Sequence, residues 1–278
     1  AGVVKGIERI SKIIMPALFL IFIVLIFQSL SLPGAMEGVK FLLQPKWEYL
    51  LKADTWVMAL GQAIFTVSIN GCGMVVYGSY LKKEYDIPHL AVSTAVLDTL
   101  AAVLASFVIM PAVFAFGLDA KSGPPLLFMT MPVIFEKMPG GTILAVIFFI
   151  SLLCAAISSS INMLEGVVEA ILSHSKLTRK KAVILVGVIT FVLSVPLNLS
   201  MTTFDQFTNL ITVVISPLMA LLVLIVFYYL HDGEKALAAI NEGAGKPLGK
   251  RFLAFAKYVF VIVTILVVIL GIVYGGIG

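Results

Sequence analysis

The chain has 278 residues, of which 60% are hydrophobic and 12% charged, with a mean hydropathy of +1.10. Soluble domains are about 45–50% apolar and about 25% charged, so a chain this apolar lacks the polar surface that water requires. The composition excludes a secreted disulfide scaffold, a disordered tail, a nucleic-acid module and most soluble enzymes. The cysteines Cys72 and Cys154 lie in apolar runs and predict neither a disulfide framework nor a metal site. The expected solvent is a lipid bilayer.

Seven apolar segments are long enough to cross a bilayer as helices, which takes about 20 residues each. Polar or turn-rich stretches separate them. The sequence therefore predicts an all-α membrane protein with seven transmembrane helices. The segments cover roughly residues 13–31, 56–81, 88–117, 141–172, 182–199, 207–230 and 253–276.

The positions of the basic residues predict how the chain is oriented, because Lys and Arg collect on the cytoplasmic side of a membrane. With the N-terminus inside, the inside segments hold 14 of the 19 Lys and Arg residues. We therefore expect a cytoplasmic N-terminus and an outside C-terminus. This distribution also explains the net charge of +4 without a nucleic-acid partner.

Two connecting segments have structure of their own. Segment 118–140 has a short apolar piece between Pro and Gly breakers, which predicts a non-spanning helix in an outside loop that dips towards the bundle. Segment 231–252 predicts a short surface helix followed by a Gly-rich turn on the inside.

Three acidic residues, Asp98, Glu165 and Glu169, fall well inside the predicted spans, where a charge is costly and usually functional. Asp98 lies about 13 Å into its span at 1.5 Å per residue, with no Lys or Arg near it in sequence. A carboxylate in this position favours a bound cation or a proton. The alternative is a protonated structural aspartate that hydrogen-bonds a neighbouring helix.

The predicted span 56–81 contains Asn70, Gly71 and Gly73 at its middle. Glycine costs about 1 kcal/mol relative to alanine in a helix interior, so this run predicts a break at about 68–73. A broken helix exposes backbone carbonyls and N–H groups that bind ions and polar ligands. The alternative is a close contact between two unbroken helices through small residues.

A polar stripe follows one face of the predicted span 141–172. At about 100° per residue, Ser158, Asn162, Glu165 and Glu169 share that face, and Ser159 lies one step round from it. Serine hydroxyls beside a free carbonyl suit Na⁺, a hard cation that prefers oxygen ligands. The alternative is that the serines bond back to their own helix or to a neighbouring one.

Several long motifs in this chain resemble the neurotransmitter:sodium symporters, especially the bacterial sodium-dependent amino-acid transporters with the LeuT fold. The resemblance runs from residue 6 to the end of the chain. The motifs that carry it are GIERISKIIMP, GQAIFTVSINGCGMVVYGSYL, AVLDTLAAVLASFVIMPAVFAFG, GPPLLFMTMPVIFEKMPGG and AAISSSINMLE.

The resemblance implies helices five to eleven of a fold built from two inverted repeats, in one polytopic membrane domain. Residues 1–31 then form the last helix of the first repeat, 55–230 the second repeat and 253–276 an additional helix. The first four helices of the family are absent from this chain and would be its partner. We expect a multi-pass protein of the bacterial inner membrane.

The resemblance also assigns ligand roles, which no spacing argument supplies. For the first sodium, it implies that Thr66 and Asp98 are ligands and that the Asp98 carboxylate replaces chloride. For the second sodium, it implies a backbone carbonyl and two hydroxyls, from Ala155, Ser158 and Ser159. It implies that the substrate pocket is lined by Phe65, Thr66, Ser68, Gly71, Ser159 and Met163.

Further residues match the family's gates. Gln62 matches a residue near the outer gate, and Tyr80 and Glu165 match a polar cluster near the inner gate. Gly6 and Pro16 match a motif that unwinds the fifth helix during inward opening. Two gate acids of the family are replaced, one by Thr208, with Asp205 one turn earlier, and one by Ser173.

These observations together predict a sodium-coupled symporter of amino acids or related small amines that works by alternating access, with Na⁺ as the co-transported ion. Enzymatic catalysis has no support, because the chain has no Walker loop, dinucleotide glycine pattern or Ser/His/Asp constellation. The replaced gate residues leave one alternative, a non-transporting sensor or binding paralogue. Asp98 as a proton site leaves another, a proton-coupled amino-acid carrier.

Overall fold

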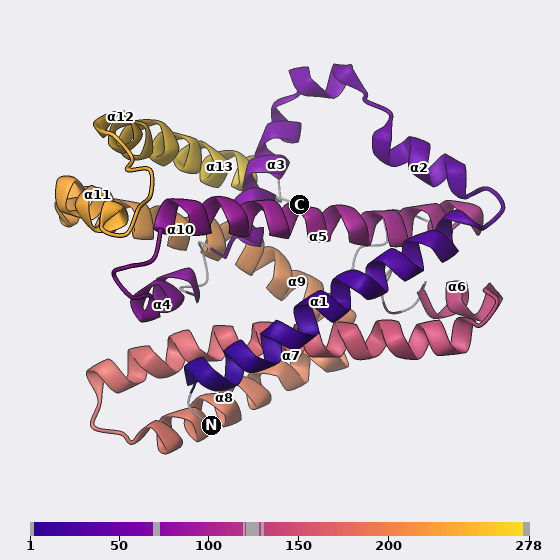
Figure 1. The fold of residues 1–278 in the computed structure, drawn as a ribbon, viewed down its shortest axis with the longest axis horizontal. Coiled ribbons are helices and arrows are strands. Elements are labelled where there is room, and N and C mark those ends of the chain that lie inside the picture. Colours follow the sequence, from indigo (N-terminus) through magenta and orange to yellow (C-terminus); the bar gives the residue numbers. More distant parts are fainter. Residues whose placement is uncertain (1–2, 69–72, 119, 121–127, 129–130, 275–278) are drawn as a thin grey trace. The chain divides into compact units, whose positions relative to one another are not determined.

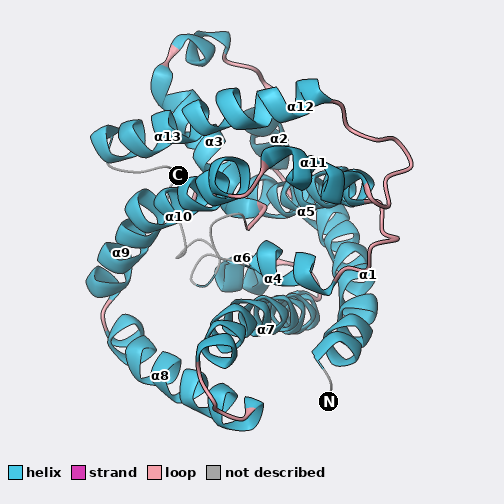
Figure 2. Cartoon of the chain, turned by 90° about the vertical axis from the view of Figure 1, so that its left-hand side faces the viewer, coloured by secondary structure: helices cyan, strands magenta, loops and turns pink. Residues whose placement is uncertain are grey.

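The computed structural model describes residues 3–68, 73–118, 120, 128 and 131–274. Within these ranges the regular structure is helical and contains no strand (Figure 2), which confirms the predicted all-α class. The α-helices are α1 (Val3–Leu30), α2 (Ala35–Leu43), α3 (Ala53–Thr66), α4 (Gly73–Tyr80), α5 (Ile87–Ala115), α6 (Met131–Lys137), α7 (Gly141–His174), α8 (Arg179–Leu199), α9 (Met201–Asn209), α10 (Ser216–Ile225), α11 (Gly233–Asn241), α12 (Lys250–Ala254) and α13 (Val261–Tyr274). Trp47–Leu51 forms a 3₁₀ turn, and π-helical stretches at Leu210–Ile215, Val226–Leu230 and Phe255–Phe260 continue α9, α10 and α12.

Four stretches among the described residues are long and apolar enough to cross a membrane: α5, α7, α8 and Lys250–Val273. Two bent pairs raise the number to six if each pair is one span, namely Met15–Leu30 with Ala35–Leu51 and Ser216–Leu230 with Gly233–Asn241. The remaining predicted span, 56–81, corresponds to α3 and α4, and residues 69–72 between these helices lie outside the described part. A span count of seven stays a prediction.

The chain forms two compact units, and the first comprises residues Ala1–Lys46 and Leu97–Ile161. Its core is apolar and includes Leu25 of α1, Val113 of α5 and Phe148 of α7. The aromatic ring of Phe135 in α6 lies 5.5 Å from that of Phe148, and Figure 1 shows α6 beside the start of α7. The short helix predicted in segment 118–140 is therefore present as α6, while residues 119, 121–127 and 129–130 lie outside the described part.

Helix α2 was not predicted, and a close backbone approach explains its position. A Cβ on Gly38 would lie 2.5 Å from the Met110 carbonyl oxygen and 2.6 Å from the Pro111 Cα, so only glycine lets α2 pack on the end of α5. The Phe41 and Phe114 rings lie 5.1 Å apart in the same contact. Close by, the buried Ser29 hydroxyl donates to the Val108 carbonyl oxygen at 2.8 Å. These contacts fix the turn between α1 and α2 against α5.

The second unit comprises Trp47–Val96 and Asn162–Gly278. Three apolar clusters hold it together: Val57, Ile64, Ala220 and Val267 join α3, α10 and α13; Leu224, Tyr228, Ala256 and Val261 join α10 to the last helices; Val168, Ala182 and Val186 join α7 to α8. The surface helix and Gly-rich turn predicted for 231–252 are confirmed as α11 and the residues after it. Asp232 caps α11 by accepting a hydrogen bond from the Glu234 backbone N–H at 3.0 Å.

We predict that Gly38→Val destabilises the protein, because its side chain meets the α5 backbone and overpacking of this kind costs about 1–3 kcal/mol. Thermal unfolding of the intact protein in detergent measures the effect. Gly187→Ala is the matched control, since a Cβ at this position in α8 has nothing within 4 Å. Equal melting temperatures for the two variants would contradict the packing of α2 on α5.

Candidate functional site

The predicted helix break lies between α3 and α4. Helix α3 ends at Thr66, Ser68 has φ 55°, and a new helix begins at Gly73. A non-glycine residue in the left-handed region costs about 1–2 kcal/mol, and such conformations gather at functional sites. Gly71 and its neighbours Asn70 and Cys72 lie outside the described residues. The end of α3 at Thr66 and the left-handed φ of Ser68 confirm that the helix is interrupted at the start of the predicted break.

The other residues predicted to line the substrate pocket lie on two stretches of chain. Phe65 and Thr66 are in the last turn of α3, and Ser68 follows them. Ser159 and Met163 lie one turn apart on α7. Phe65 and Met163 are 46% and 64% exposed within this chain, so each presents a large apolar surface that no described residue covers.

On α7 the structure brings two predicted sodium ligands together. The Ser158 hydroxyl donates to the Ala155 carbonyl oxygen at 2.8 Å, and Ser158 is buried. This is the back-bonded geometry that we considered as the alternative for the serine stripe. It also places two oxygens side by side, because the hydroxyl oxygen keeps its lone pairs when its hydrogen points to the carbonyl. Ser159, the third predicted ligand, is exposed on an adjoining face.

The two predicted ligands of the first sodium belong to different units. Asp98 lies on α5 in the first unit and is half-buried, and Thr66 lies on α3 in the second unit and is also half-buried. Each is therefore described within its own unit, and neither is without an interaction.

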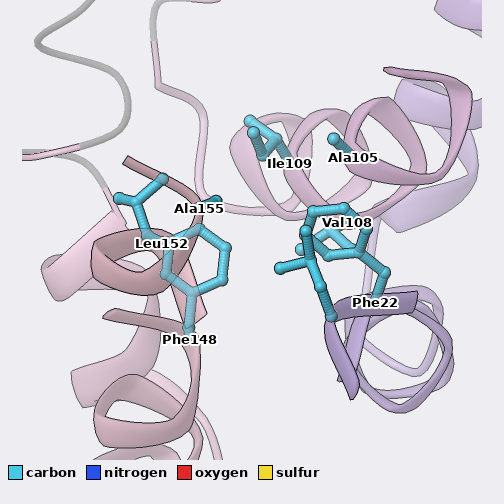
Figure 3. Close-up of a pocket in the computed structure, with 8 residues that line it drawn as sticks. Phe22, Ala105, Val108, Ile109, Phe148, Leu152 and Ala155 are labelled. Carbon is cyan, nitrogen blue, oxygen red and sulfur yellow. The ribbon is translucent and has the colours of Figure 1, made fainter. Parts of the chain in front are cut away.

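A cavity of about 220 Å³ in the first unit borders Ala155 (Figure 3). All its lining side chains are apolar, and no residue predicted to bind substrate is among them. A cavity with an apolar lining offers no polar partner for a charged amine or carboxylate. The cavity is therefore not the predicted substrate pocket. Its lining residues are Leu18, Phe22, Ala105, Val108, Ile109, Phe148, Leu152 and Ala155.

Tyr80 and Glu165, which match the inner-gate cluster of the family, contact each other within a larger polar cluster. Their gate role stays a prediction. The Tyr80 hydroxyl lies 3.0 Å from Glu165 Oε1 and 3.2 Å from Glu169 Oε1, and it has one hydrogen to donate to either. Arg179 Nη2 donates to both oxygens of Glu165 at 2.5 and 2.6 Å, and Arg179 Nη1 donates to Glu169 at 2.8 Å. One guanidinium thus pairs with two carboxylates on consecutive turns of α7.

Sequence reasoning placed Glu165 and Glu169 on one face but assigned them no cation. Arg179 is the missing partner, ten residues beyond Glu169 at the first position of α8. The signal was present, because a tight connection between α7 and α8 returns the chain to the same end of both helices. The sequence predicts the two glutamates in a span and Arg179 in the loop after it, so it does not predict their ion pair.

Two buried polar atoms near this cluster have no hydrogen-bond partner among the described residues. They are the Tyr77 hydroxyl, one turn before Tyr80, and Asn162 Oδ1, one turn before Glu165. Buried polar groups in folded proteins almost always have partners. These two atoms mark a place where water or a further segment of protein completes the site.

The remaining predicted gate residues occupy described helices. Gln62 on α3 and Asp205 on α9 are both exposed. Gly6 and Pro16 lie within α1, which is continuously helical from Val3 to Leu30, so the motif for unwinding is in its helical form here. At the positions of the two replaced gate acids, the Ser173 hydroxyl donates to the Ala170 carbonyl oxygen at 2.9 Å, and Thr208 on α9 also has an interaction.

The sequence of this chain matches the model of the sodium:neurotransmitter symporter family over residues 1–277. It is 38% identical over 262 residues to an uncharacterized sodium-dependent transporter of Bacillus subtilis, which covers 90% of this chain and 57% of that protein. It is 38% identical over 184 residues to an uncharacterized sodium-dependent transporter of Haemophilus influenzae, covering 66% of this chain and 40% of the relative. The chain thus spans about half the length of these curated relatives.

The fold resembles the crystal structure of MhsT in complex with L-phenylalanine, with a TM-score of 0.85 and 34% sequence identity. The match covers 96% of this chain and 63% of MhsT. The helical architecture is therefore that of a LeuT-type transporter, as the motifs predicted. Proteins of this family are transporters and not enzymes.

We predict that Arg179→Gln lowers the free energy of unfolding by about 1–3 kcal/mol, because it leaves the Glu165 carboxylate buried without its cation. The cost lies below that of a fully buried pair, since the Arg179 side chain is 41% exposed. Thermal unfolding measures it, with the exposed neighbour Lys180→Gln as control. The double variant Glu165→Gln/Arg179→Gln should recover part of the loss, and no recovery would argue against the pairing.

Proposed function

This chain belongs to the sodium:neurotransmitter symporter family, and from that premise we propose that it forms part of a sodium-coupled symporter of amino acids or related small amines. Its relatives include sodium-dependent transporters from bacteria and an archaeon and a serotonin transporter of Drosophila melanogaster. The L-phenylalanine in the MhsT complex supports an amino acid as the substrate class.

The observation that carries this proposal is the pair of oxygens on α7. The Ala155 carbonyl and the Ser158 hydroxyl lie 2.8 Å apart on a helix long and apolar enough to span a membrane. Hard cations such as Na⁺ prefer neutral and anionic oxygen ligands, and an ion in hydrocarbon requires them. With Ser159 they form this chain's share of the second sodium site.

The first sodium site is proposed at Thr66 and Asp98, with the Asp98 carboxylate also supplying the negative charge that chloride provides in other members. The proposed substrate pocket is built around the break after α3, from Phe65, Thr66, Ser68, Gly71, Ser159 and Met163. The half-helix ends at such a break offer backbone N–H groups to a carboxylate and carbonyl oxygens to cations. Thr66 thus belongs to both the substrate pocket and an ion site.

Coupling requires that sodium and substrate jointly stabilise the same closed state. A sodium ion that crosses the membrane down its potential contributes about 2.3 kcal/mol per 100 mV, in addition to its concentration gradient. We propose that the cluster of Tyr80, Glu165, Glu169 and Arg179 closes the inner side of the pathway, because Tyr80 ends the second half of the broken helix. Gln62 and Asp205 act on the outer side, and Gly6 and Pro16 permit α1 to unwind.

We also propose the arrangement of this chain in the membrane. Residues 1–31 form the last helix of a first repeat, 55–230 a second repeat and 253–276 an additional helix of one polytopic domain, with the N-terminus cytoplasmic in a bacterial inner membrane. Preceding helices of the intact protein complete both sodium sites. Beside the Tyr80 cluster, the unpartnered atoms of Tyr77 and Asn162 support a further partner there, since neither has a hydrogen bond among the described residues.

Uptake by the intact protein in proteoliposomes tests the function. We expect a panel of labelled amino acids and amines to contain a substrate that accumulates under an inward sodium gradient, and a sodium ionophore to abolish the accumulation. Binding without accumulation would favour the non-transporting paralogue. Accumulation driven by a pH gradient without sodium would favour the proton-coupled carrier, with Asp98 as its proton site.

A serine pair on α7 separates the ion role from helix packing. We predict that Ser158→Ala raises the sodium concentration for half-maximal uptake by about tenfold, which corresponds to about 1.4 kcal/mol for the loss of one oxygen ligand. Ser151→Ala is the control, because the Ser151 hydroxyl is also buried on α7 and also donates back to its own helix, at 2.7 Å to the Ile147 carbonyl. An equal shift in both variants would refute the ion role of Ser158.

A further inference from the structure

Two connections in the second unit touch each other through backbone as well as side chains. The α4–α5 turn, residues 81–86, follows the second half of the broken helix, and the Gly-rich turn, residues 242–248, follows α11. Lys83 Nζ and Glu242 Oε1 form an ion pair at 3.0 Å, and the Gly245 backbone N–H donates to Asp86 Oδ2 at 2.9 Å. Figure 1 shows α11 beside the start of α5.

The two turns approach more closely than any side chain at Gly243 would allow. A Cβ on Gly243 would collide with the Tyr85 carbonyl oxygen and lie 2.7 Å from both the Glu84 carbonyl carbon and the Lys83 carbonyl oxygen. Three successive residues of the α4–α5 turn therefore lie against one glycine. Because the two turns meet through backbone atoms at Gly243, no side-chain rotation can widen the gap between them.

Each turn is also fixed internally. The Asn241 side chain accepts a hydrogen bond from the Leu248 N–H at 2.8 Å and donates to the Leu248 carbonyl oxygen at 2.9 Å, which closes the Gly-rich turn. On the other side, Asp86 Oδ1 accepts from the His89 N–H at 3.0 Å and caps the first turn of α5. The hydrogen bonds from His89 and Gly245 hold the pKa of Asp86 below its usual value, so the carboxylate remains ionised.

The contrast with the Tyr80 cluster is the basis of the inference. The Tyr80 hydroxyl contacts the carboxylates of Glu165 and Glu169, which lie on rotatable side chains and are paired with Arg179. The α4–α5 turn, a few residues later, is held by backbone contacts and by the Asp86 carboxylate, which accepts two hydrogen bonds. The Gly-rich turn connects α11 to the last helices, and these helices pack against α10 through an apolar cluster of Leu224, Tyr228, Ala256 and Val261. The end of α4 thus has one contact suited to opening and one suited to staying closed.

We propose that the contact between the α4–α5 turn and the Gly-rich turn is a permanent pivot, about which α4 swings when the Tyr80 cluster opens. This inference rests on the proposed transport function. It assigns Asp86 and Gly243 as positioning residues, which hold the end of α4 and do not touch ion or substrate.

A covalent link across the contact tests the pivot. Lys83→Cys/Glu242→Cys in the intact protein, with Cys72 and Cys154 replaced by alanine, is treated with a short bifunctional thiol reagent. A pivot that never opens predicts an uptake rate within about twofold of the unlinked protein, since the gating motion is unhindered. Uptake that is lost on linking and restored when the link is cleaved would overturn the proposal. Each single-cysteine variant with the same reagent controls for modification alone.

The unlinked double variant separates this inference from the proposed function. If it shows no sodium-driven uptake while the parent protein, with Lys83 and Glu242 unchanged, does, spin labels at the two positions replace the transport readout. One unchanged distance distribution with and without sodium and substrate supports the pivot, and a second, longer population contradicts it. If neither protein shows sodium-driven uptake, the proposed function fails, and the spin-label distances still decide whether the contact opens.

Asp86→Asn gives a second readout. Asparagine has one acceptor oxygen for the two N–H groups that Asp86 serves, so it can still cap α5 but loses Gly245. We expect the maximal uptake rate to fall by about threefold to tenfold with little change in the substrate concentration for half-maximal uptake, as for a residue that acts on a motion. An unchanged rate, or a change confined to apparent substrate affinity, would argue against a pivot.

Discussion

The cost of an unpaired polar group in hydrocarbon governs where each polar residue of this chain lies. With 60% of its residues hydrophobic, the chain has few polar side chains that can pair with buried polar groups of its helices. Arg179 serves two glutamates, Ser29 serves the Val108 carbonyl, and Ser158 serves the Ala155 carbonyl. A polar group that finds no such partner inside a membrane protein is a place where an ion, a substrate or another helix belongs.

That constraint gives the sodium hypothesis its physical content. A helix break after Thr66 and a half-buried carboxylate at Asp98 are both destabilising in an apolar chain, and a bound cation at Asp98, as we propose, would stabilise the carboxylate. For Ser158, a hydrogen bond to its own helix and a proposed role as a sodium ligand are compatible. Its hydroxyl donates to the Ala155 carbonyl oxygen at 2.8 Å, and the same two oxygens are the ones that we propose as sodium ligands.

The features that depend on local composition were predictable from sequence. Long apolar runs predicted α5, α7 and α8, the glycines at 71 and 73 predicted the break, and the Gly-rich stretch after Asn241 predicted a turn. The family motifs placed Tyr80 and Glu165 in one polar cluster, and in the structure the Tyr80 hydroxyl lies 3.0 Å from Glu165. The sodium and substrate ligands stay predictions, because Thr66 and Asp98 belong to separate units and Gly71 lies outside the described residues.

Features that depend on tertiary approach were not predictable. Helix α2 forms against α5 because Gly38 permits the contact, and nothing in its own nine residues indicates that neighbour. In the sequence Arg179 is one of several basic residues of a predicted loop, and only the α7–α8 connection in the structure places it against Glu165. Likewise, Gly243 reads as turn composition, and only the carbonyl groups of residues 83 and 85 show why it must be glycine.

Movement of sodium together with substrate is the central claim, and a co-flux measurement tests it most directly. The intact protein in vesicles, with equal sodium on both sides and no membrane potential, receives a gradient of its substrate and a trace of radioactive sodium. Our account predicts that sodium enters with the substrate in a fixed ratio and stops when the substrate is removed. Substrate entry without accompanying sodium would show that the oxygens on α7 and the carboxylate on α5 do not carry a coupling ion.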